Sequence, residues 1–239
     1  MANTKLTAEG SELLDDASNY SDERYENPSV TADVCVCRIN DGAVEVLLIK
    51  RKFAPFKDAW AIPGGFLNTN REGILDCATR ELAEETGVIG ISPIQFGAYG
   101  DPMRDPRQHV VTIAHYAIVT AETMDYNSIE AMDDANEYAW FKLKELPDMA
   151  FDHSIILMDL FDKLKAGVEM QVTAFNFITS TFTWRDLLNV YRAFDCVCAE
   201  NASNFRKFIN ARIKFEETGE SRSDVGRPAI LFKNPVSTI

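Results

Sequence analysis

Apolar and polar side chains alternate over residues 32–39, and a run rich in β-branched residues follows at 44–49. Residues 40–42, Asn-Asp-Gly, stand between these stretches and favour the tight turn of a β-hairpin. The pattern therefore predicts two antiparallel strands at the start of the folded chain. Two later stretches, 109–120 and 138–141, are rich in β-branched or aromatic residues and are expected to form further strands.

Helical spacing replaces this alternation in two places. Between Glu72 and Thr86, apolar residues recur every three or four positions, and Gly87 stands where a glycine commonly ends a helix. Residues 151–165 show the same spacing and predict a second amphipathic helix. Because strands and helices are interleaved, we expect an α/β or α+β fold for this part of the chain.

A second unit is predicted beyond residues 167–180, where the pattern weakens. Thr183 and Asp186 have the spacing of a capping box ahead of one helix, and residues 203–212 form a second. Short strands are expected at 213–217 and 229–233, on either side of a hairpin rich in Gly, Ser and Arg. Two helices followed by a basic hairpin indicate a winged helix-turn-helix.

The predicted organisation is an N-terminal arm at 1–28, with one helical turn near 9–16, a first domain at 29–168 and a second at 169–239. A chain of 239 residues that is 46% hydrophobic can build such a pair of cores. The chain has no apolar run long enough to span a membrane, and its start is polar and acidic, so we expect a cytoplasmic protein without a membrane partner. Five cysteines without zinc-site spacing indicate reduced, buried thiols.

Charge distinguishes the two units. The net charge of −13 argues against nucleic acid as a partner, because phosphate binding needs a basic surface. However, residues 1–175 contain 15 Lys and Arg against 30 Asp and Glu, whereas residues 176–239 contain nine against seven. The second unit is therefore the part whose charge favours DNA.

The first predicted helix carries three carboxylates on one face. Glu81, Glu84 and Glu85 are spaced i, i+3 and i+4, so their side chains project about one turn apart. Mg²⁺ prefers clustered carboxylate oxygens, a backbone carbonyl and the phosphates of a substrate. Arg80 can pair with Glu84 and fix the carboxylate geometry. An acidic face that is merely solvated is the alternative reading.

Residues 65–88 resemble the Nudix box: glycine, five free positions, glutamate, seven free positions, then Arg-Glu-apolar-any-Glu-Glu-any-Gly-apolar. The matching residues are Gly65, Glu72, Arg80, Glu81, Leu82, Glu84, Glu85, Gly87 and Val88. Six residues separate Gly65 from Glu72, one more than in the family pattern, so the positions of these two residues depend on how the longer loop folds.

This resemblance implies a pyrophosphohydrolase that uses Mg²⁺, with Mn²⁺ as an alternative ion. It also implies the ligands of that ion, which are the Gly65 carbonyl and the carboxylates of Glu81, Glu84 and Glu85. Catalytic roles are implied for Arg80, Glu84 and Glu85, and Glu72 supports the site. Nudix enzymes often place a general base on a loop, and here Asp133, Asp134 and Glu137 are candidates, with Glu137 preferred among the three. A merely solvated acidic loop is the favoured interpretation for each of them.

Further segments resemble Nudix-related transcriptional regulators of NAD and sugar metabolism, namely residues 100–107, 150–153, 204–207 and 226–229. The resemblance implies a Nudix α/β/α sandwich with a mixed sheet, followed by a C-terminal winged helix. In that group the Nudix domain senses or hydrolyses ADP-ribose or related nucleotides. Arg104 and Arg107 are therefore candidates for contacting a substrate phosphate, or else they form salt bridges in a loop or a dimer.

The second unit supplies candidate DNA contacts. The predicted second helix presents Asn204, Arg206, Lys207 and Asn210 opposite its apolar stripe, and the hairpin carries Arg222 and Arg227. In this reading a homodimer places two basic units on one double-stranded, palindromic site. Ordinary solvated charges are the alternative for all six residues.

Three functions remain open from the sequence. The leading one is hydrolysis of a nucleoside diphosphate linked to another moiety, such as ADP-ribose, a nucleotide sugar or a dinucleotide. The rival is a transcription regulator whose Nudix pocket only binds the nucleotide, and in a third reading the second unit binds protein. His115 and His153 are expected to be structural, and Cys35 and Cys37 to share one packed strand face.

Overall fold

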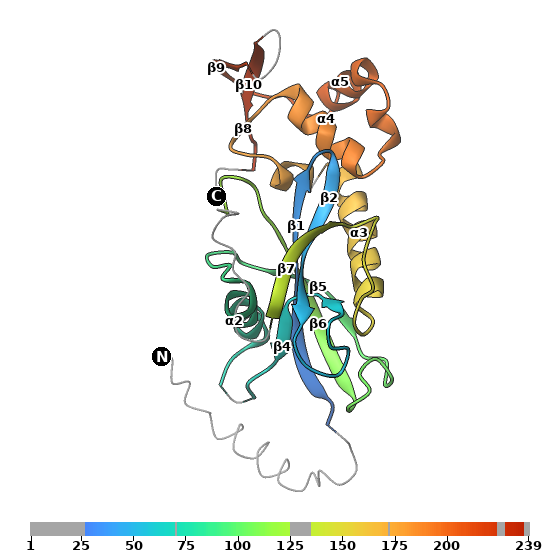
Figure 1. Cartoon of the computed structure of the whole chain (residues 1–239). Helices are drawn as coiled ribbons and strands as arrows, with labels where there is room; N and C mark the ends of the chain where they lie inside the picture. Colours follow the sequence, from blue (N-terminus) through green and yellow to red (C-terminus); the bar gives the residue numbers. More distant parts are fainter. Residues whose placement is uncertain (1–26, 70, 125–134, 172, 224–227, 237–239) are drawn as a thin grey trace, which may run out of the picture.

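The computed structural model describes residues 27–69, 71–124, 135–171, 173–223 and 228–236. The helical turn predicted near residues 9–16, the candidate acids Asp133 and Asp134, and Arg227 lie outside these described residues. Figure 1 shows a twisted sheet between two helices, with the C-terminal unit stacked on one end of the sheet. The strands of the large sheet are β1 (Ser29–Asn40), β2 (Ala43–Arg51), β3 (Trp60–Ala61), β4 (Gly64–Phe66), β5 (Ile94–Tyr99), β6 (Val110–Ile118) and β7 (Ala135–Lys142).

Strand β1 organises the large sheet. It pairs antiparallel with β2 and β4 and parallel with β6, so the sheet is mixed. The predicted hairpin turn is confirmed, because Asp41 and Gly42 both adopt positive φ, at 47° and 72°, between β1 and β2. Strand β5 was not predicted. It lies at the sheet edge with most side chains partly exposed and a register shift, so its alternation is weak.

The two faces of the sheet are covered by one helix each, α2 (Ile74–Thr86) and α3 (His153–Glu169). Alternate side chains of β1 pack on opposite faces of the sheet. Val34 and Val36 belong to the apolar cluster that includes α2, whereas Cys35 and Cys37 belong to the cluster that includes α3. The predicted sandwich is therefore confirmed, and so is the shared packed face of the two cysteines.

Helix α2 forms where the apolar spacing predicts it. Its first turn is capped by Asp76, whose carboxylate accepts a 3.2 Å hydrogen bond from the N–H of Gly73. Gly87 ends the helix with φ of 71°, a left-handed conformation that glycine adopts without steric cost. These two ends fix which turn of the helix carries the three glutamates.

The C-terminal unit combines two helices with a small sheet. Helices α4 (Trp184–Ala193) and α5 (Ala202–Asn210) precede a three-stranded sheet in the order β8 (Thr181–Phe182), β10 (Ala229–Lys233), β9 (Glu217–Arg222). The capping box predicted for α4 is present, since the hydroxyl of Thr183 accepts from the Asp186 N–H and Asp186 accepts from the Thr183 N–H. Two helices with a strand hairpin confirm the predicted winged helix-turn-helix. No helix in the described ranges has the length and apolarity to cross a membrane.

The strand predicted at 213–217 is wrong, because β9 begins only at Glu217. Ile213 and Phe215 are partly buried against the core, and the ring of Phe215 lies 5.3 Å from that of Trp184. An extended segment that buries alternate side chains gives the same sequence pattern as a strand. It forms no ladder here because the pairing with β10 starts at Glu217.

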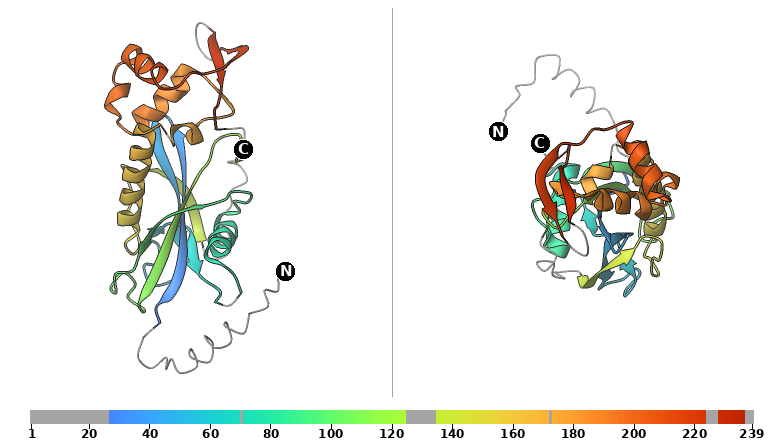
Figure 2. Two further views of the ribbon diagram at one scale, coloured as in Figure 1. Left: turned by 180° about the vertical axis from the view of Figure 1, so that it is seen from behind. Right: turned by 90° about the horizontal axis from the view of Figure 1, so that it is seen from above.

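One apolar cluster joins the two units. Phe194, directly after α4, stacks on Phe161 of α3 at 5.5 Å and meets Phe177 at 5.4 Å. Phe177 belongs to a short 3₁₀ helix, η3 (Ala174–Phe177), inside the segment predicted to separate the domains. Ala174, Phe175, Phe177 and Ile178 of that segment are buried, and the β1–β2 turn reaches the C-terminal unit in Figure 1 and in the left view of Figure 2. The domain limits at 168 and 169 stay a prediction.

Asn234 generates a stability prediction. Its buried amide nitrogen donates to the carbonyls of Phe175, Ile178 and Thr179 at 2.9, 3.1 and 3.1 Å. Asn234→Ala should lower the free energy of unfolding by about 2 kcal/mol, because buried acceptors lose their donor. Asn234→Asp should cost more, since it points a carboxylate at those carbonyls. Denaturant unfolding of both, beside exposed Asn210→Ala as control, checks this, and a stable Asn234→Asp would contradict it.

Candidate functional site

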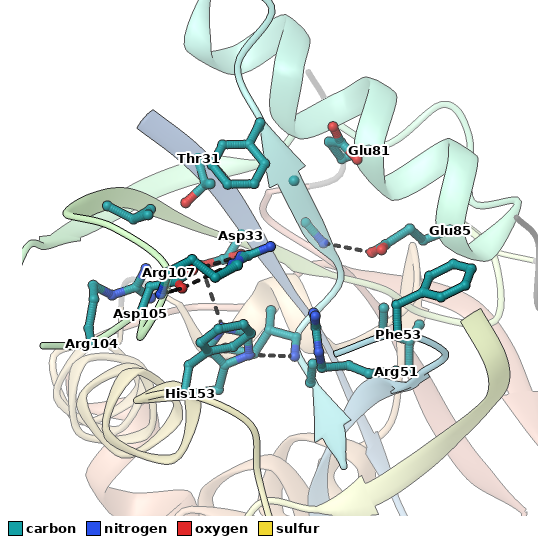
Figure 3. A pocket seen from close by; sticks show the side chains of 18 of the residues that line it. Thr31, Asp33, Arg51, Phe53, Glu81, Glu85, Arg104, Asp105, Arg107 and His153 are labelled. Atoms are coloured by element: carbon teal, nitrogen blue, oxygen red, sulfur yellow. Dashed lines mark hydrogen bonds and ion pairs between the residues drawn. The ribbon is translucent and has the colours of Figure 1, made fainter. Parts of the chain in front are cut away.

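A cavity of about 490 Å³ opens at the end of the large sheet that lies away from the C-terminal unit. Its walls come from the start of β1, the end of β2, the β3–β4 segment, helix α2, the loop before β6 and the start of α3 (Figure 3). Residues from six separate parts of the chain therefore meet around one opening.

Arg80 gathers the acids of α2. Its guanidinium donates to Glu81 at 2.7 Å and to Glu84 at 2.9 Å. It also forms a two-point contact with Glu72, at 2.9 and 2.7 Å. The repulsion expected between closely spaced carboxylates is therefore offset by one shared cation.

The longer loop does not separate Glu72 from this cluster. The N–H of Asn68 donates to Glu72 at 2.9 Å, and the N–H of Arg71 donates to the Asn68 carbonyl at 3.1 Å. Hydrogen bonds from Arg80 and from the Asn68 backbone lower the pKa of Glu72 from 4.5 to about 2. Glu72 is therefore ionised at neutral pH and binds Arg80 through Nε and Nη2, whereas the helix acids bind Nη1.

Gly64 and Gly65 bring the backbone against the same helix. The N–H of Gly64 donates to Glu85 at 2.7 Å. A Cβ on Gly65 would lie 2.4 Å from the carboxylate of Glu81, so a larger residue here would displace that side chain. Burial raises the pKa of Glu81 above its ordinary value, despite the hydrogen bond from Arg80.

These residues fit a divalent metal by the chemistry of their donors. Glu81, Glu84 and Glu85 supply carboxylate oxygens, and the backbone of Gly65 lies beside Glu81. Hard cations such as Mg²⁺ prefer this donor set. Within the described ranges no three acidic, His or Cys side chains are arranged to hold a metal ion as they stand. Arg80 contacts Glu81 and Glu84, and the N–H of Gly64 contacts Glu85.

A cationic and aromatic wall faces the same cavity. The guanidinium of Arg51 lies 4.8 Å from the ring centre of Phe151, and that of Arg107 lies 5.5 Å from the ring of Phe66. Lys52 and Phe53 also line the cavity. Figure 3 shows Arg51, Arg107 and Glu85 around one opening, so anionic and cationic groups flank the same space.

The structure places the two predicted arginine contacts differently. Arg104 is buried, with 4% of its side chain exposed, and makes a two-point ion pair with Asp152 at 2.9 and 2.7 Å. Arg107 pairs with Asp105 at 2.7 Å but leaves 43% of its side chain exposed. Both line the cavity. Arg104 therefore matches the salt-bridge alternative, and Arg107 is the better placed for a ligand.

Two predicted catalytic residues lie outside the cavity lining. Glu137 is exposed on β7 and pairs with Lys50 at 3.3 Å, and 51% of the Glu84 side chain is exposed. The described residues that line the cavity include Glu81 and Glu85 but neither of these. The exposed position of Glu137 on β7 therefore gives no support to its predicted role as the general base.

The two histidines expected to be structural are buried. His115 meets the Ile113 carbonyl through Nδ1 at 2.9 Å, and burial lowers its pKa. His153 lines the cavity and accepts a hydrogen bond from the Ile62 N–H at 2.9 Å. Of these two histidines, His153 is the one that lines the cavity.

The predicted DNA contacts lie mostly on α5. Four of them are exposed there, Asn204, Arg206, Lys207 and Asn210. Arg206 also lies over the ring of Trp184, at 5.6 Å. Arg222 differs, because it contacts both carboxylate oxygens of Asp186 at 2.8 and 2.7 Å and so ties β9 to the first turn of α4.

Sequence reasoning missed several cavity residues. Arg51, Lys52 and Phe53 directly follow the strand predicted at 44–49, and residues at a strand end commonly line a site. Asp33 lies inside an otherwise apolar alternation, and it is buried with a 2.7 Å hydrogen bond from Thr112. The signal in the sequence that could have identified Asp33 was its position as an acid within an otherwise apolar strand.

Comparison with known proteins gives a consistent result. A family model described as "NUDIX domain" matches residues 29–160. The ADPR responsive transcriptional repressor NtrR of Acinetobacter baylyi is 27% identical over 219 residues, which cover 90% of this chain and 86% of that protein. An ADP-ribose pyrophosphatase of Methanocaldococcus jannaschii is 39% identical over 135 residues, which cover 56% of this chain and 74% of that protein.

Solved structures resemble the chain over nearly its whole length. A MutT/nudix family protein from Enterococcus faecalis superposes with a TM-score of 0.74 at 30% identity, covering 94% of this chain and 93% of the other. NrtR from Shewanella oneidensis, solved in complex with a 27mer DNA, gives a TM-score of 0.67 at 26% identity, covering 86% and 93%. The likeness therefore includes both units.

The close approach at Gly65 generates a prediction. Gly65→Ala should displace the Glu81 carboxylate and weaken Mn²⁺ binding by about tenfold or more, because supporting contacts of metal ligands have effects of this size. Gly73→Ala is the matched control, since its Cβ would meet only Asp76, at 3.4 Å. Calorimetric titration with Mn²⁺ compares the two variants. Equal affinities would show that the Gly65 contact does not shape the metal site.

Proposed function

Starting from the fact that this chain belongs to the Nudix family, we propose that its first unit hydrolyses a diphosphate bond. The substrate class is a nucleoside diphosphate linked to another moiety, with ADP-ribose as the favoured member. One observation carries the proposal, which is that the acids of α2 and the cations at the end of β2 and before β6 flank one cavity.

The residues divide the work of the reaction. Glu81, Glu84, Glu85 and the Gly65 carbonyl would hold Mg²⁺ or Mn²⁺. Such a dication, when bound, would neutralise phosphate charge and lower the pKa of the attacking water. Arg80 keeps the carboxylates in place between Glu72 and the helix, through contacts of 2.7 to 2.9 Å. Catalysis in this proposal is mainly charge stabilisation by groups that are already oriented.

The opposite wall would bind the substrate. Arg51 and Arg107 supply guanidinium groups, which suit phosphate oxygens because of their planar array of donors. Phe53 and Phe66 are large side chains that remain 56% and 40% exposed at the cavity, and a nucleobase can stack on such rings. The relatives named for ADP-ribose support this choice of ligand.

A second function, DNA binding by the C-terminal unit, has its own supporting observation. The exposed face of α5 presents Asn204, Arg206, Lys207 and Asn210 together, and the second helix of such a unit commonly enters the major groove. The structural relative solved with a 27mer DNA supports the same reading. In this proposal Arg222 positions the hairpin through Asp186 and does not read bases.

The two functions are compatible in one chain. A homodimer would present two copies of α5 to one duplex, which predicts a palindromic site with half-sites one or two helical turns apart. Nucleotide in the cavity would shift DNA binding only by the difference in its affinity for the two conformations. A transcription regulator that responds to its own substrate follows from this arrangement.

Hydrolysis is tested through the helix acids. Glu84→Gln and Glu85→Gln should each lower kcat by about 100-fold or more with the fold intact, because each removes charge facing a dication without changing shape. The assay uses Mg²⁺ with ADP-ribose, NAD, dinucleoside polyphosphates and oxidised nucleotides. Glu145→Gln serves as the control, since Glu145 is an exposed partner of Lys142. Unchanged turnover in both helix variants would refute the catalytic assignment.

DNA binding is tested by selection of genomic fragments at low salt, with and without ADP-ribose. The wild type should enrich a palindrome, and its affinity should fall steeply as salt rises. The double variant Arg206→Ala, Lys207→Ala should bind more weakly, whereas an exposed acid on another element, Asp162→Asn, should not matter. If neither condition enriches a palindrome, the C-terminal unit is a protein-contact module instead.

A further inference from the structure

We propose that His153 is a positioning residue, which fixes the β3–β4 segment against the acids of α2; this inference rests on the function proposed above. His153 is buried in the first turn of α3 and lines the cavity. Its Nδ1 accepts a 2.9 Å hydrogen bond from the backbone N–H of Ile62. A side chain of α3 therefore holds the backbone segment that reaches α2 on the other side of the sheet.

Consecutive residues of that segment are held from three directions. After Ile62, the carbonyl of Pro63 accepts a 2.8 Å hydrogen bond from Val34 of β1. The N–H of Gly64 then donates to Glu85 of α2 at 2.7 Å. Removing the acceptor at His153 leaves the buried N–H of Ile62 unpaired, so the segment loses this hydrogen bond to α3.

The surroundings of His153 suit an acceptor role at Nδ1. A neutral ring that accepts at Nδ1 carries its proton on Nε2, and Nε2 lies 3.9 Å from Asp33 Oδ2. Thr112 donates to the same oxygen at 2.7 Å. Burial lowers the pKa of His153 and thus keeps the ring neutral.

Asp152, the residue before His153, is also held in place, and this helps to position the His153 ring. Asp152 forms its two-point ion pair with buried Arg104 at 2.9 and 2.7 Å. Helix ends commonly fray, yet here the first turn of α3 is held both by this pair and by the bond to Ile62. Arg104 acts on the site through α3 in this inference, without touching the substrate.

Three substitutions separate positioning from packing. His153→Asn places an amide oxygen near the position of Nδ1, whereas His153→Gln places it nearer Nε2. His153→Ala removes both, and exposed His109→Ala is the control. Two measurements are made on each variant: hydrogen exchange at residues 62–65 without metal, and kcat and KM for ADP-ribose across a Mn²⁺ titration.

We expect faster exchange and an approximately tenfold to 100-fold lower kcat in the Ala and Gln variants, with KM changed much less. The Asn variant should restore both readings. Unchanged exchange in His153→Gln, or an Asn variant as impaired as His153→Ala, would overturn the inference. Should the Ala variant fail to fold, the Gln and Asn pair still decides. If the wild type does not hydrolyse ADP-ribose, the proposed function fails, while exchange still decides the role of His153.

Discussion

The site depends on one guanidinium placed among three carboxylates. Glu72, Glu81 and Glu84 all lie within 2.9 Å of Arg80 nitrogens, and without that cation their charges would repel one another at close range. Arg80 also donates to the Phe66 carbonyl at 3.2 Å, so the loop that enters the helix is tied to the same group. Charge balance and loop geometry are therefore set together, which is why one extra loop residue leaves Glu72 in contact with the helix.

The cavity and the C-terminal unit occupy opposite ends of the first unit, and α3 spans the distance between them. The helix has 17 residues, which is about 25 Å at 1.5 Å per residue. His153 lines the cavity at its start, and Val168 near its end belongs to the apolar cluster shared with α4. A ligand that binds every conformation of the protein equally well would couple nothing between the two ends, so coupling requires two conformations that the ligand distinguishes.

Buried polar groups beneath the cavity are the costly part of this design. Asp33, Arg104 and His153 are all buried. The free-energy cost of removing charged groups from water is offset only where their hydrogen bonds and ion pairs have good geometry. The two-point pair of Arg104 with Asp152 and the hydrogen bond from Thr112 to Asp33 supply that geometry. An apolar core would be easier to build here. What the polar groups add is a fixed orientation of the segments that line the cavity.

The sequence alone determined the interleaved strands and helices, the glutamate face and the two-unit order, because these follow from local periodicity and from spacing within one helix. The sandwich was implied by the Nudix resemblance. Only the tertiary structure decided which distant residues meet. Arg51 reaches the cavity because β2 ends there, Arg104 is taken by Asp152, and Glu137 points to Lys50. Likewise Ile213 and Phe215 alternate like a strand, yet they pack without a ladder partner. Pairing and burial depend on the whole fold, and local pattern does not encode them.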